Sequence, residues 1–368
     1  MRRIAIVVAA TTMTLSLAGC SMLNATETSS DAGPTKGSDV TVGVLMPEKT
    51  NTRYEQFDYP IMKEKIASLT GNRGKTEYAN AESDAKKQKT QMEKMIDDKV
   101  DVIVLDAVDS HAIAETVTKA KDAGIPVIAY DRLAEGPIDA YVSFDGELVG
   151  EVQGRSLLEA LGSSADTSDK IVMINGSPTD PNAKVFKTGA LSELNGKVTV
   201  AASYDTAAWS PDTAEKEMTE AIKKLGKKNI AAVYSANDAM AGAIIKAFQS
   251  AGVTDLPPIT GQDAELPAVQ RIVAGEQFMS VYKPYPDLAE AAAEMAVAKV
   301  QGHNIQFDAL VPDRVDSPTN KKIPAQLVTV VALQKDNIKQ TVIADGIYKV
   351  SDICTNKYKA DCQAINLK

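Results

Sequence analysis

The fold of this 368-residue chain is decided by residues 102–133, which read VIVLDAVDSHAIAETVTKAKDAGIPVIAYDRL. Apolar runs at 102–105 and 127–130 predict two short buried strands, and the amphipathic segment between them predicts a helix over 111–123. Strands that alternate with amphipathic helices in this way are typical of parallel sheets covered by helices on both faces. The segment therefore predicts an α/β fold, and its second strand ends directly at Asp131.

The same alternation continues on both sides of this segment. The further predicted strands are 40–45, 140–144, 171–174, 198–203, 231–235, 259–261, 278–282 and 327–331. The further predicted helices are 58–69, 85–100, 148–161, 183–194, 213–225, 239–249 and 288–300. Because the cycle of strands and helices runs twice, we expect two doubly wound lobes.

Composition excludes several classes of function. The chain has 40 Lys+Arg against 49 Asp+Glu, a formal net charge of -9 and a pI near 5.0, so nucleic acid is not an expected partner. Only two His, His111 and His303, and three Cys are present, which makes a His-centred catalytic triad or a multi-His metal site hard to assemble. We therefore expect a site that uses no metal and no cofactor.

The N-terminus carries an export pattern. Arg2 and Arg3 precede an apolar stretch that is too short for an ordinary transmembrane helix and ends in Leu-Ala-Gly-Cys at residues 17–20. This ending resembles a bacterial lipoprotein cleavage box, and the alternative is an ordinary secretory signal with a chance Cys. We expect residues 1–19 to be a signal peptide, Cys20 to be acylated, and residues 20–38, rich in Ser, Thr and Ala, to form a flexible tether.

The two other cysteines, Cys354 and Cys362, lie near the C-terminus. Outside the cytoplasm two nearby thiols usually pair, so we expect a disulfide that staples the C-terminal tail, residues 351–368. A redox or metal site is the alternative, but no His or third Cys lies nearby in the sequence.

Polar and aromatic residues follow seven of the predicted strands. In open α/β sheets, ligands bind beyond the carboxyl ends of the strands, so these residues are the candidates for a site. In chain order the candidates are Arg53, Tyr54, Asp131, Arg132, Asn182, Trp209, Asn237, Asp263 and Lys283. Lys49, Asp180 and Gln262 also follow such strands. Planar groups that donate or accept paired hydrogen bonds suit sugar hydroxyls, and an aromatic plate suits the C–H face of a sugar.

Each candidate also has a structural explanation of its own. Asn237 could cap the helix that begins at residue 239, and Trp209 could belong to the core. Asp131 and Arg132 could be a loop ion pair, and Lys283 could belong to a turn before Pro284. Their joint occurrence at the same end of successive strands is the stronger signal, and it favours a polar binding site.

A resemblance to a known family adds to this interpretation. The segments that carry it are Ala129–Leu133, Phe144-Asp145, Gly176–Pro178, Asn182-Ala183, Asn237-Asp238, Gly261–Ala264, Ala274–Glu276 and Val281–Pro284. From about Val40 to Tyr348 the chain resembles the sugar-binding proteins of ABC importers, especially the D-xylose-binding and multiple-monosaccharide-binding branch. Relatives often carry Trp where this chain has Tyr54, and Asn where it has Pro181.

The resemblance implies a periplasmic binding protein type I fold, with two interleaved lobes joined by three crossovers near Phe144, Lys283 and Gln326. It implies an N-terminal lobe of residues 39–144 and 284–326, and a C-terminal lobe of residues 145–283 and 327–350. It also implies that the nine candidates hold the sugar, with Trp209 as the facing aromatic residue.

The resulting prediction is an extracytoplasmic, lipid-anchored, monomeric receptor. It would bind a xylose-like or glucose/galactose-like pyranose between the lobes, close, and deliver the sugar to the permease of an ABC importer. The alternative is a sensor that presents the sugar to a membrane signalling protein. A repressor is disfavoured because no helix-turn-helix precedes the lobes. A sugar-modifying enzyme that uses Asp131 and Asp263 is disfavoured because Arg132 and Lys283 would keep both carboxylates ionised.

Overall fold

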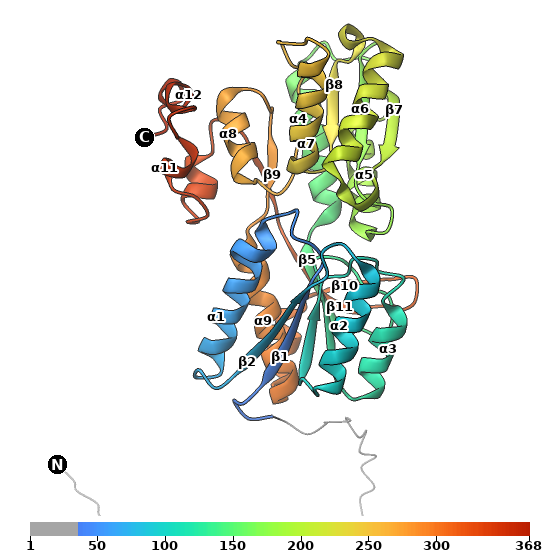
Figure 1. Ribbon diagram of the computed structural model, residues 1–368, viewed down its shortest axis with the longest axis vertical. Helices are drawn as coiled ribbons and strands as arrows, with labels where there is room; N and C mark the ends of the chain where they lie inside the picture. Colours follow the sequence, from blue (N-terminus) through green and yellow to red (C-terminus); the bar gives the residue numbers. More distant parts are fainter. Residues whose placement is uncertain (1–35) are drawn as a thin grey trace, which may run out of the picture. The chain divides into compact units, whose positions relative to one another are not determined.

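The computed structural model describes residues 36–368 (Figure 1). The predicted signal peptide, the lipidation site Cys20 and most of the predicted tether lie outside the described residues. The tether was predicted to end at residue 38. Lys36 already contacts the folded body, since its backbone N–H donates to the Val300 carbonyl at 2.9 Å. Within residues 36–368, no helix combines the length and the apolar character that a membrane span requires.

Lobe one is built on a seven-stranded sheet of order β10-β11-β5-β4-β3-β1-β2. All its pairings are parallel except that of β10 with β11. The strands are β1 (Thr41–Met46), β2 (Lys75–Asn80), β3 (Val102–Leu105), β4 (Val127–Tyr130), β5 (Ala140–Phe144), β10 (Asp313–Val315) and β11 (Ile323–Val328). Every residue of β3, β4 and β5 is buried, as expected for strands covered on both faces.

Helices cover both faces of this sheet (Figure 1). The helices α1 (Tyr59–Leu69) and α9 (Tyr285–Gln301) pack together on one face, and α2 (Ala85–Asp97) and α3 (Ala114–Asp122) lie on the other. The short α10 (Asn304–Leu310) follows α9. The predicted alternation of strand and helix is confirmed for β1, β3, β4 and β5 and their helices, whereas β2 and β10 were not predicted. The helix α9 returns from a distant part of the chain to complete the lobe.

Lobe two contains a parallel three-stranded sheet, β7-β6-β8, and a separate antiparallel pair, β12-β9. Its strands are β6 (Lys170–Asn175), β7 (Thr199–Asp205), β8 (Ala232–Ser235), β9 (Ser280–Tyr282) and β12 (Val331–Leu333). Its helices are α4 (Gly146–Leu161), α5 (Pro181–Leu194), α6 (Pro211–Leu225), α7 (Asp238–Ser250) and α8 (Leu266–Ala274). The predicted strand 259–261 is not a regular strand, because this segment meets its neighbours only through isolated bridges from Ile259 to Val233 and from Gln262 to Val281.

Two glycines let α4 and α5 approach closely. A Cβ atom on Gly150 would lie 2.0 Å from the carbonyl oxygen of Phe186, and one on Gly189 would lie 2.2 Å from the carbonyl oxygen of Glu147. Only residues without a side chain fit such a crossing. The contact fixes the N-terminal half of α5, which faces the other lobe.

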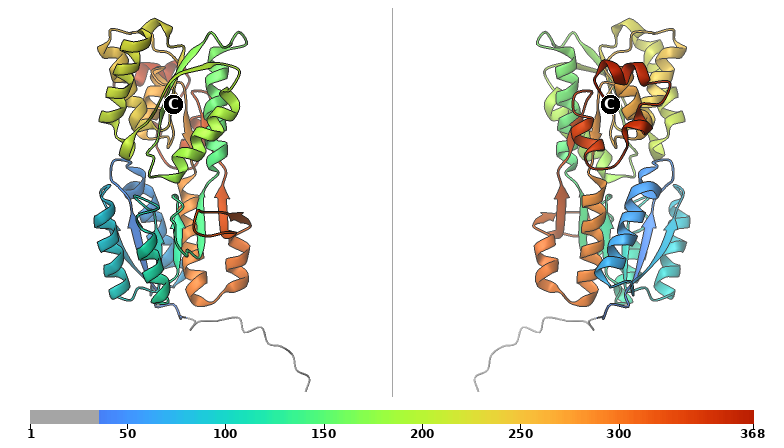
Figure 2. Two further views of the ribbon diagram at one scale, coloured as in Figure 1. Left: turned by 90° about the vertical axis from the view of Figure 1, so that its right-hand side faces the viewer. Right: turned by 90° about the vertical axis from the view of Figure 1, so that its left-hand side faces the viewer.

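Three chain segments pass between the lobes (Figure 2). They connect β5 to α4, β9 to α9, and β11 to β12. The first two lie where we expected them, near Phe144 and Lys283. The third was predicted at Gln326, but Val328 still pairs with Phe144 in the sheet of lobe one.

The third crossover therefore lies at residues 329–330, and β12 begins at Val331, which pairs with Tyr282. This corrects both the lobe boundary at 326/327 and the predicted strand 327–331. The run Leu-Val-Thr-Val-Val at 327–331 is almost continuously apolar, so the sequence pattern does not mark where the chain changes sheets.

The C-terminal tail packs on lobe two. Its helices α11 (Val350–Ile353) and α12 (Lys359–Ala364) contact α8, and the Gln270 side chain donates to the Asp352 carbonyl at 2.9 Å. The structure joins Cys354 and Cys362 in a disulfide. Just before the tail, the Tyr348 ring meets Phe57 of lobe one edge to face, with centroids 6.1 Å apart.

Candidate functional site

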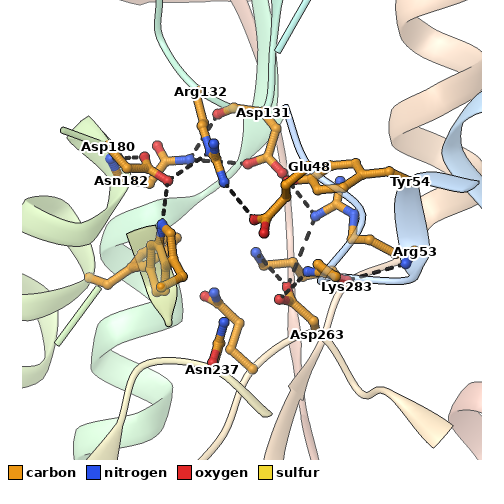
Figure 3. A pocket seen from close by; sticks show the side chains of 14 residues that line it. Glu48, Arg53, Tyr54, Asp131, Arg132, Asp180, Asn182, Asn237, Asp263 and Lys283 are labelled. Atoms are coloured by element: carbon orange, nitrogen blue, oxygen red, sulfur yellow. Dashed lines mark hydrogen bonds and ion pairs between the residues drawn. The ribbon is translucent and has the colours of Figure 1, made fainter. Parts of the chain in front are cut away.

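A single pocket brings together all nine predicted site residues (Figure 3). Five further residues line the same pocket: Glu48, Asn51, Asp180, Phe186 and Gln262. The pocket is small, with a volume of about 30 Å³, which is room for one or two water molecules. Its walls come from loops at the carboxyl ends of strands in both lobes, as the predicted fold requires.

Arg53 lies in the loop after β1, directly before a π-helical turn of residues Tyr54–Asp58, and is only 2% exposed. Its guanidinium contacts the carboxylates of Asp58 at 2.8 Å and of Asp131 at 2.9 Å. It also lies over the rings of Tyr54 and Tyr285, 5.0 and 4.9 Å from their centroids. Burial opposes the charge, but Asp58 and Asp131 outweigh it and raise the pKa of Arg53 well above its usual value. Arg53 is therefore a fixed cation with a fixed orientation.

Asp131 connects this cation to lobe two. Its side-chain and backbone oxygens accept hydrogen bonds from Asn182 Nδ2 at 3.0 and 2.9 Å, and its carbonyl accepts from the hydroxyls of Tyr141 and Ser143, both at 2.7 Å. Burial would raise the pKa of Asp131, but the neighbouring cations, Arg53 first, lower it below its usual value. Asp131 therefore stays a carboxylate, which can accept hydrogen bonds from ligand hydroxyls.

Arg132 forms a second bridge between the lobes. Its Nε lies 2.8 Å from a carboxylate oxygen of Asp180, at the start of α5, and its Nη2 donates to Glu48 at 3.2 Å. Nη1 donates to the carbonyl of Ala107 at 3.1 Å. Burial raises the pKa of Asp180 and of Glu48 above their usual values, and Arg132 opposes this rise in both cases. Asp131 and Arg132 therefore do not form an ion pair with each other. Asp131 pairs with Arg53, and Arg132 pairs with Asp180 and Glu48.

Trp209 and Phe186 form the aromatic wall of lobe two. Their ring centroids lie 6.4 Å apart, and Trp209 Nε1 donates to Asp180 at 3.1 Å. The indole lies flat against the backbone at Gly176, where a Cβ atom would come within 2.0 Å of the ring. Gly176 is therefore required for Trp209 to reach the pocket wall.

Asp263 and Lys283 close the pocket on the hinge side. Lys283 Nζ lies 3.0 Å from Asp263 Oδ1 and over the rings of Phe144 and Phe186, 5.2 and 5.3 Å from their centroids. Asn51 of lobe one donates to Asp263 Oδ2 at 2.7 Å. With the Asn182–Asp131 and Arg132–Asp180 contacts, this hydrogen bond makes a third link between the lobes at the pocket.

Asn237 and Gln262 complete the lining. Asn237 caps α7, since its side-chain oxygen accepts from the Met240 backbone N–H at 2.9 Å, and it lines the pocket as well. The capping alternative and the site prediction are therefore compatible. Gln262 Oε1 is buried and has no hydrogen-bond partner among the described residues, which leaves an acceptor available at the pocket.

Sequence analysis did not assign five of the lining residues to the site, and the sequence marks some of them more clearly than others. Glu48 and Asn51 belong to the same loop after β1 as the predicted Arg53, so the loop was identified but only its end was chosen. Phe186 lies one helical turn after Asn182 on α5 and could have been found from that spacing. Asp180 and Gln262 were recognised at strand ends but not assigned to the site.

The chemistry of the lining is that of a polar binding site. Its charged groups are paired with one another, and its aromatic rings lie at the side of lobe two and behind Arg53. Within residues 36–368, no group of three or more His, Cys, Asp or Glu side chains is arranged to hold a metal ion.

Two α/β lobes with a polar pocket between the carboxyl ends of their strands define the two-lobed class of solute-binding folds. The sequence model described as "Periplasmic binding protein domain" matches residues 42–304, and the chain belongs to this family. This confirms the predicted family and its type I fold.

Two curated relatives are similar over most of their length. The chain is 35% identical over 321 residues to the D-xylose-binding periplasmic protein of Escherichia coli, a match that covers 86% of this chain and 93% of the relative. It is 32% identical over 336 residues to the multiple sugar-binding periplasmic receptor ChvE of Rhizobium radiobacter, covering 85% and 92%.

Among solved structures, an ABC transporter solute-binding protein from Clostridium phytofermentans with bound β-D-glucose aligns with a TM-score of 0.78 and 28% identity, covering 85% of this chain and 99% of that one. A carbohydrate transporter solute-binding protein from Chloroflexus aurantiacus in complex with D-glucose aligns with a TM-score of 0.73 and 26% identity, covering 84% and 97%.

Proposed function

We propose that this protein is an extracytoplasmic receptor that binds a monosaccharide, a xylose-like or glucose/galactose-like pyranose, in the pocket between its lobes. The observation that carries the proposal is the lining itself, in which paired carboxylates, guanidinium groups and amides converge beside Trp209. Such groups match the donors and acceptors of sugar hydroxyls. The names of the sugar-binding relatives and the glucose bound in two similar structures support the same ligand class.

Binding would favour the closed arrangement of the lobes, because groups of both lobes would contact one ligand. A shift of the open–closed equilibrium from 1:99 to 99:1 requires about 5.5 kcal/mol of differential binding. Hydrogen bonds to charged groups contribute about 1.5–3 kcal/mol each, so a few of them supply this difference. The closed form would then be the one that a partner protein recognises.

Isothermal titration of the purified protein against xylose, glucose, galactose, arabinose and ribose tests the ligand class. We expect heat of binding with at least one pyranose and weaker binding of a sugar alcohol of equal size, because an open chain must be ordered on binding. Absence of heat with every monosaccharide would contradict the proposal. Recovery of the sugar unchanged after incubation separates a receptor from a sugar-modifying enzyme.

The proposal includes a monomeric receptor that is anchored by acylated Cys20 and delivers its sugar to an ABC importer. Its support is the lipoprotein-like sequence at 17–20 and the transporter names of similar structures. Metabolic labelling with palmitate should mark the wild-type protein and not Cys20→Ser. Deletion of the gene should abolish uptake of the sugar, whereas a sensor would instead lose a transcriptional or chemotactic response and leave uptake intact.

A further inference from the structure

Among the residues that the structure describes, the pocket carries no cation that is free to bind an anionic ligand. Arg53 lies between Asp58 and Asp131, Arg132 contacts Asp180 at 2.8 Å, and Lys283 contacts Asp263 at 3.0 Å. A ligand carboxylate or phosphate could gain a charge partner here only by displacing one of these buried carboxylates. A displaced carboxylate would then remain buried without its partner, which is costly.

Carboxylates outnumber cations in and directly behind the pocket. Four carboxylates line it, and the fully buried Asp58 lies behind Arg53. Among the described lining residues the cations are Arg53, Arg132 and Lys283. The buried Asp106 behind Arg132 adds no charge to this count, because burial raises its pKa well above the usual value and favours its neutral form. The formal excess of acidic groups makes the interior of the pocket a favourable place for positive charge and an unfavourable one for negative charge.

Glu48 is the lining carboxylate with the weakest compensation. Its one side-chain hydrogen bond comes from Arg132 at 3.2 Å, and the same guanidinium also contacts Asp180 at 2.8 Å and Asp106 at 3.6 Å. Figure 3 shows the Glu48 carboxylate pointing into the space that the labelled side chains surround. The side chain is buried, with 6% of the residue exposed, so bulk water does little to screen it.

We propose that the pocket selects its sugar by charge, accepting neutral and cationic amino sugars and rejecting sugar acids and sugar phosphates, and that Glu48 is the specificity-determining residue. This inference rests on the proposed function, since it presupposes that the pocket binds a monosaccharide. Arg132 contacts three carboxyl groups and so balances the charge of Glu48 only in part. A ligand ammonium group near Glu48 would balance the rest. A neutral sugar would meet Glu48 as a hydrogen-bond acceptor.

A matched series of pyranoses tests the charge rule. D-Xylose, D-glucose, 6-amino-6-deoxy-D-glucose and D-glucuronate share their ring hydroxyls and differ at C5, which carries hydrogen, hydroxymethyl, aminomethyl or carboxylate. If glucose binds, we expect glucuronate to bind at least 100-fold more weakly and the amino sugar to bind within threefold of glucose or more tightly. If only xylose binds, the comparison is with 2-amino-2-deoxy-D-xylose.

The variant Glu48→Gln assigns the selectivity to this residue. It keeps the shape and an acceptor oxygen but removes the charge, so the affinity for the neutral sugar should fall only by the difference between a charged and a neutral acceptor. The affinity for the amino sugar should fall about tenfold relative to the neutral sugar. Glu115→Gln, which removes an exposed charge on α3, is the control and should leave the ratio unchanged.

The outcomes separate the two levels of the proposal. Glucuronate within tenfold of glucose, or an amino-to-neutral ratio that Glu48→Gln does not alter, contradicts charge selection by Glu48 while sugar binding stands. If the wild type binds none of xylose, glucose, galactose, arabinose and ribose, the result contradicts the proposed function itself.

Discussion

Asp131 has a backbone conformation that side-chain-bearing residues seldom adopt, with φ of 56°. Trp209 and Asp263 share this property, with φ of 53° and 91°. Left-handed conformations cost free energy in residues other than glycine, and they persist where the surroundings hold them, often at functional sites. In this protein three of the pocket residues carry such strain, and each is fixed by hydrogen bonds or packing to neighbours that also line or support the pocket.

Replacing Asp131 with Asn removes the charge of the side chain and keeps its shape, so it tests the effect of the charge alone. Asn tolerates the left-handed region about as well as Asp, so the loop should keep its conformation. The variant loses the carboxylate that faces Arg53, and we expect sugar affinity to fall by about 10- to 100-fold, the scale of one hydrogen bond to a charged group. Isothermal titration measures the loss, and Asp166→Asn, in an exposed turn of lobe two, is the control. Unchanged affinity would contradict a role for Asp131 in binding.

Asp238 is a buried acid directly behind the pocket. Its carboxylate accepts hydrogen bonds from Gln277 Nε2 and Ser280 Oγ, both at 2.8 Å, and from the Glu265 backbone N–H at 2.9 Å. Burial raises its pKa to about 7, although Arg271 opposes the rise. Burial and the nearby Asp238 also raise the pKa of Glu265 well above its usual value. The folded state thus holds these protons to a higher pH than the unfolded chain does.

Because protonation of Asp238 is linked to folding, the free energy of unfolding depends on pH. Because the folded pKa of Asp238 lies above the unfolded value of about 3.9, its contribution to the free energy of unfolding falls as pH rises from about 4 to about 7. Between pH 5 and pH 8, the wild type should lose about 2–3 kcal/mol relative to Asp238→Asn, which does not titrate. Urea unfolding of both proteins at the two pH values measures the difference, and parallel pH profiles would refute it.

At the scale of elements, the sequence was most informative where strands are buried on both faces. Short, mostly apolar runs predicted β3, β4 and β5 with the bounds that the structure shows. The edge strand β2 was missed because its sequence, KTEYAN, is half exposed and contains no apolar run. The helix α8 was also missed, although it is as long as the predicted α3.

The candidate site could be predicted because the carboxyl ends of parallel strands lie at one edge of a sheet, where ligands bind. This rule brought nine residues from distant parts of the chain into one pocket. It could not supply Glu48 or Asn51, because side chains within a loop of irregular structure have no periodicity that reveals where they point. It also could not place the third crossover, since a strand that leaves one sheet for another keeps the same apolar pattern.

The tail offers a test of a single covalent link. The disulfide between Cys354 and Cys362 closes a loop with a sequence separation of 8. On the chain-entropy model, such a loop contributes roughly 2.5 kcal/mol of stability. The double variant Cys354→Ser, Cys362→Ser should lose about this amount in urea unfolding, and adding a reductant should lower the wild type to the same level. A reductant effect on the double variant would show that the disulfide is not the source.

For the whole molecule, the pocket side chains also determine how the lobes meet. Three of the links are Asn182 to Asp131, Arg132 to Asp180, and Asn51 to Asp263. All three join a residue of lobe one to a residue of lobe two. The groups that would bind a ligand are thus the same groups that hold the two lobes together around the pocket.

Asn51→Ala removes one of these links without changing any charge. We expect the free protein to shift toward the open arrangement, with a larger radius of gyration in small-angle X-ray scattering, and saturating sugar to restore the wild-type value. Sugar affinity should fall by about three- to tenfold, because closure then starts from a less populated state. Asn229→Ala, whose side chain donates to the Leu225 carbonyl at an exposed turn, is the control. Identical scattering of the two free variants would contradict this account.

Trp209 is the only tryptophan in the chain, and it lies in the wall of the pocket, packed on Gly176 and hydrogen-bonded to Asp180. The protein therefore contains an intrinsic fluorophore at the one place where its emission should respond both to a bound sugar and to the separation of the lobes. No other indole contributes background, so a stopped-flow trace of unlabelled protein would report the association and closure steps as separate optical phases.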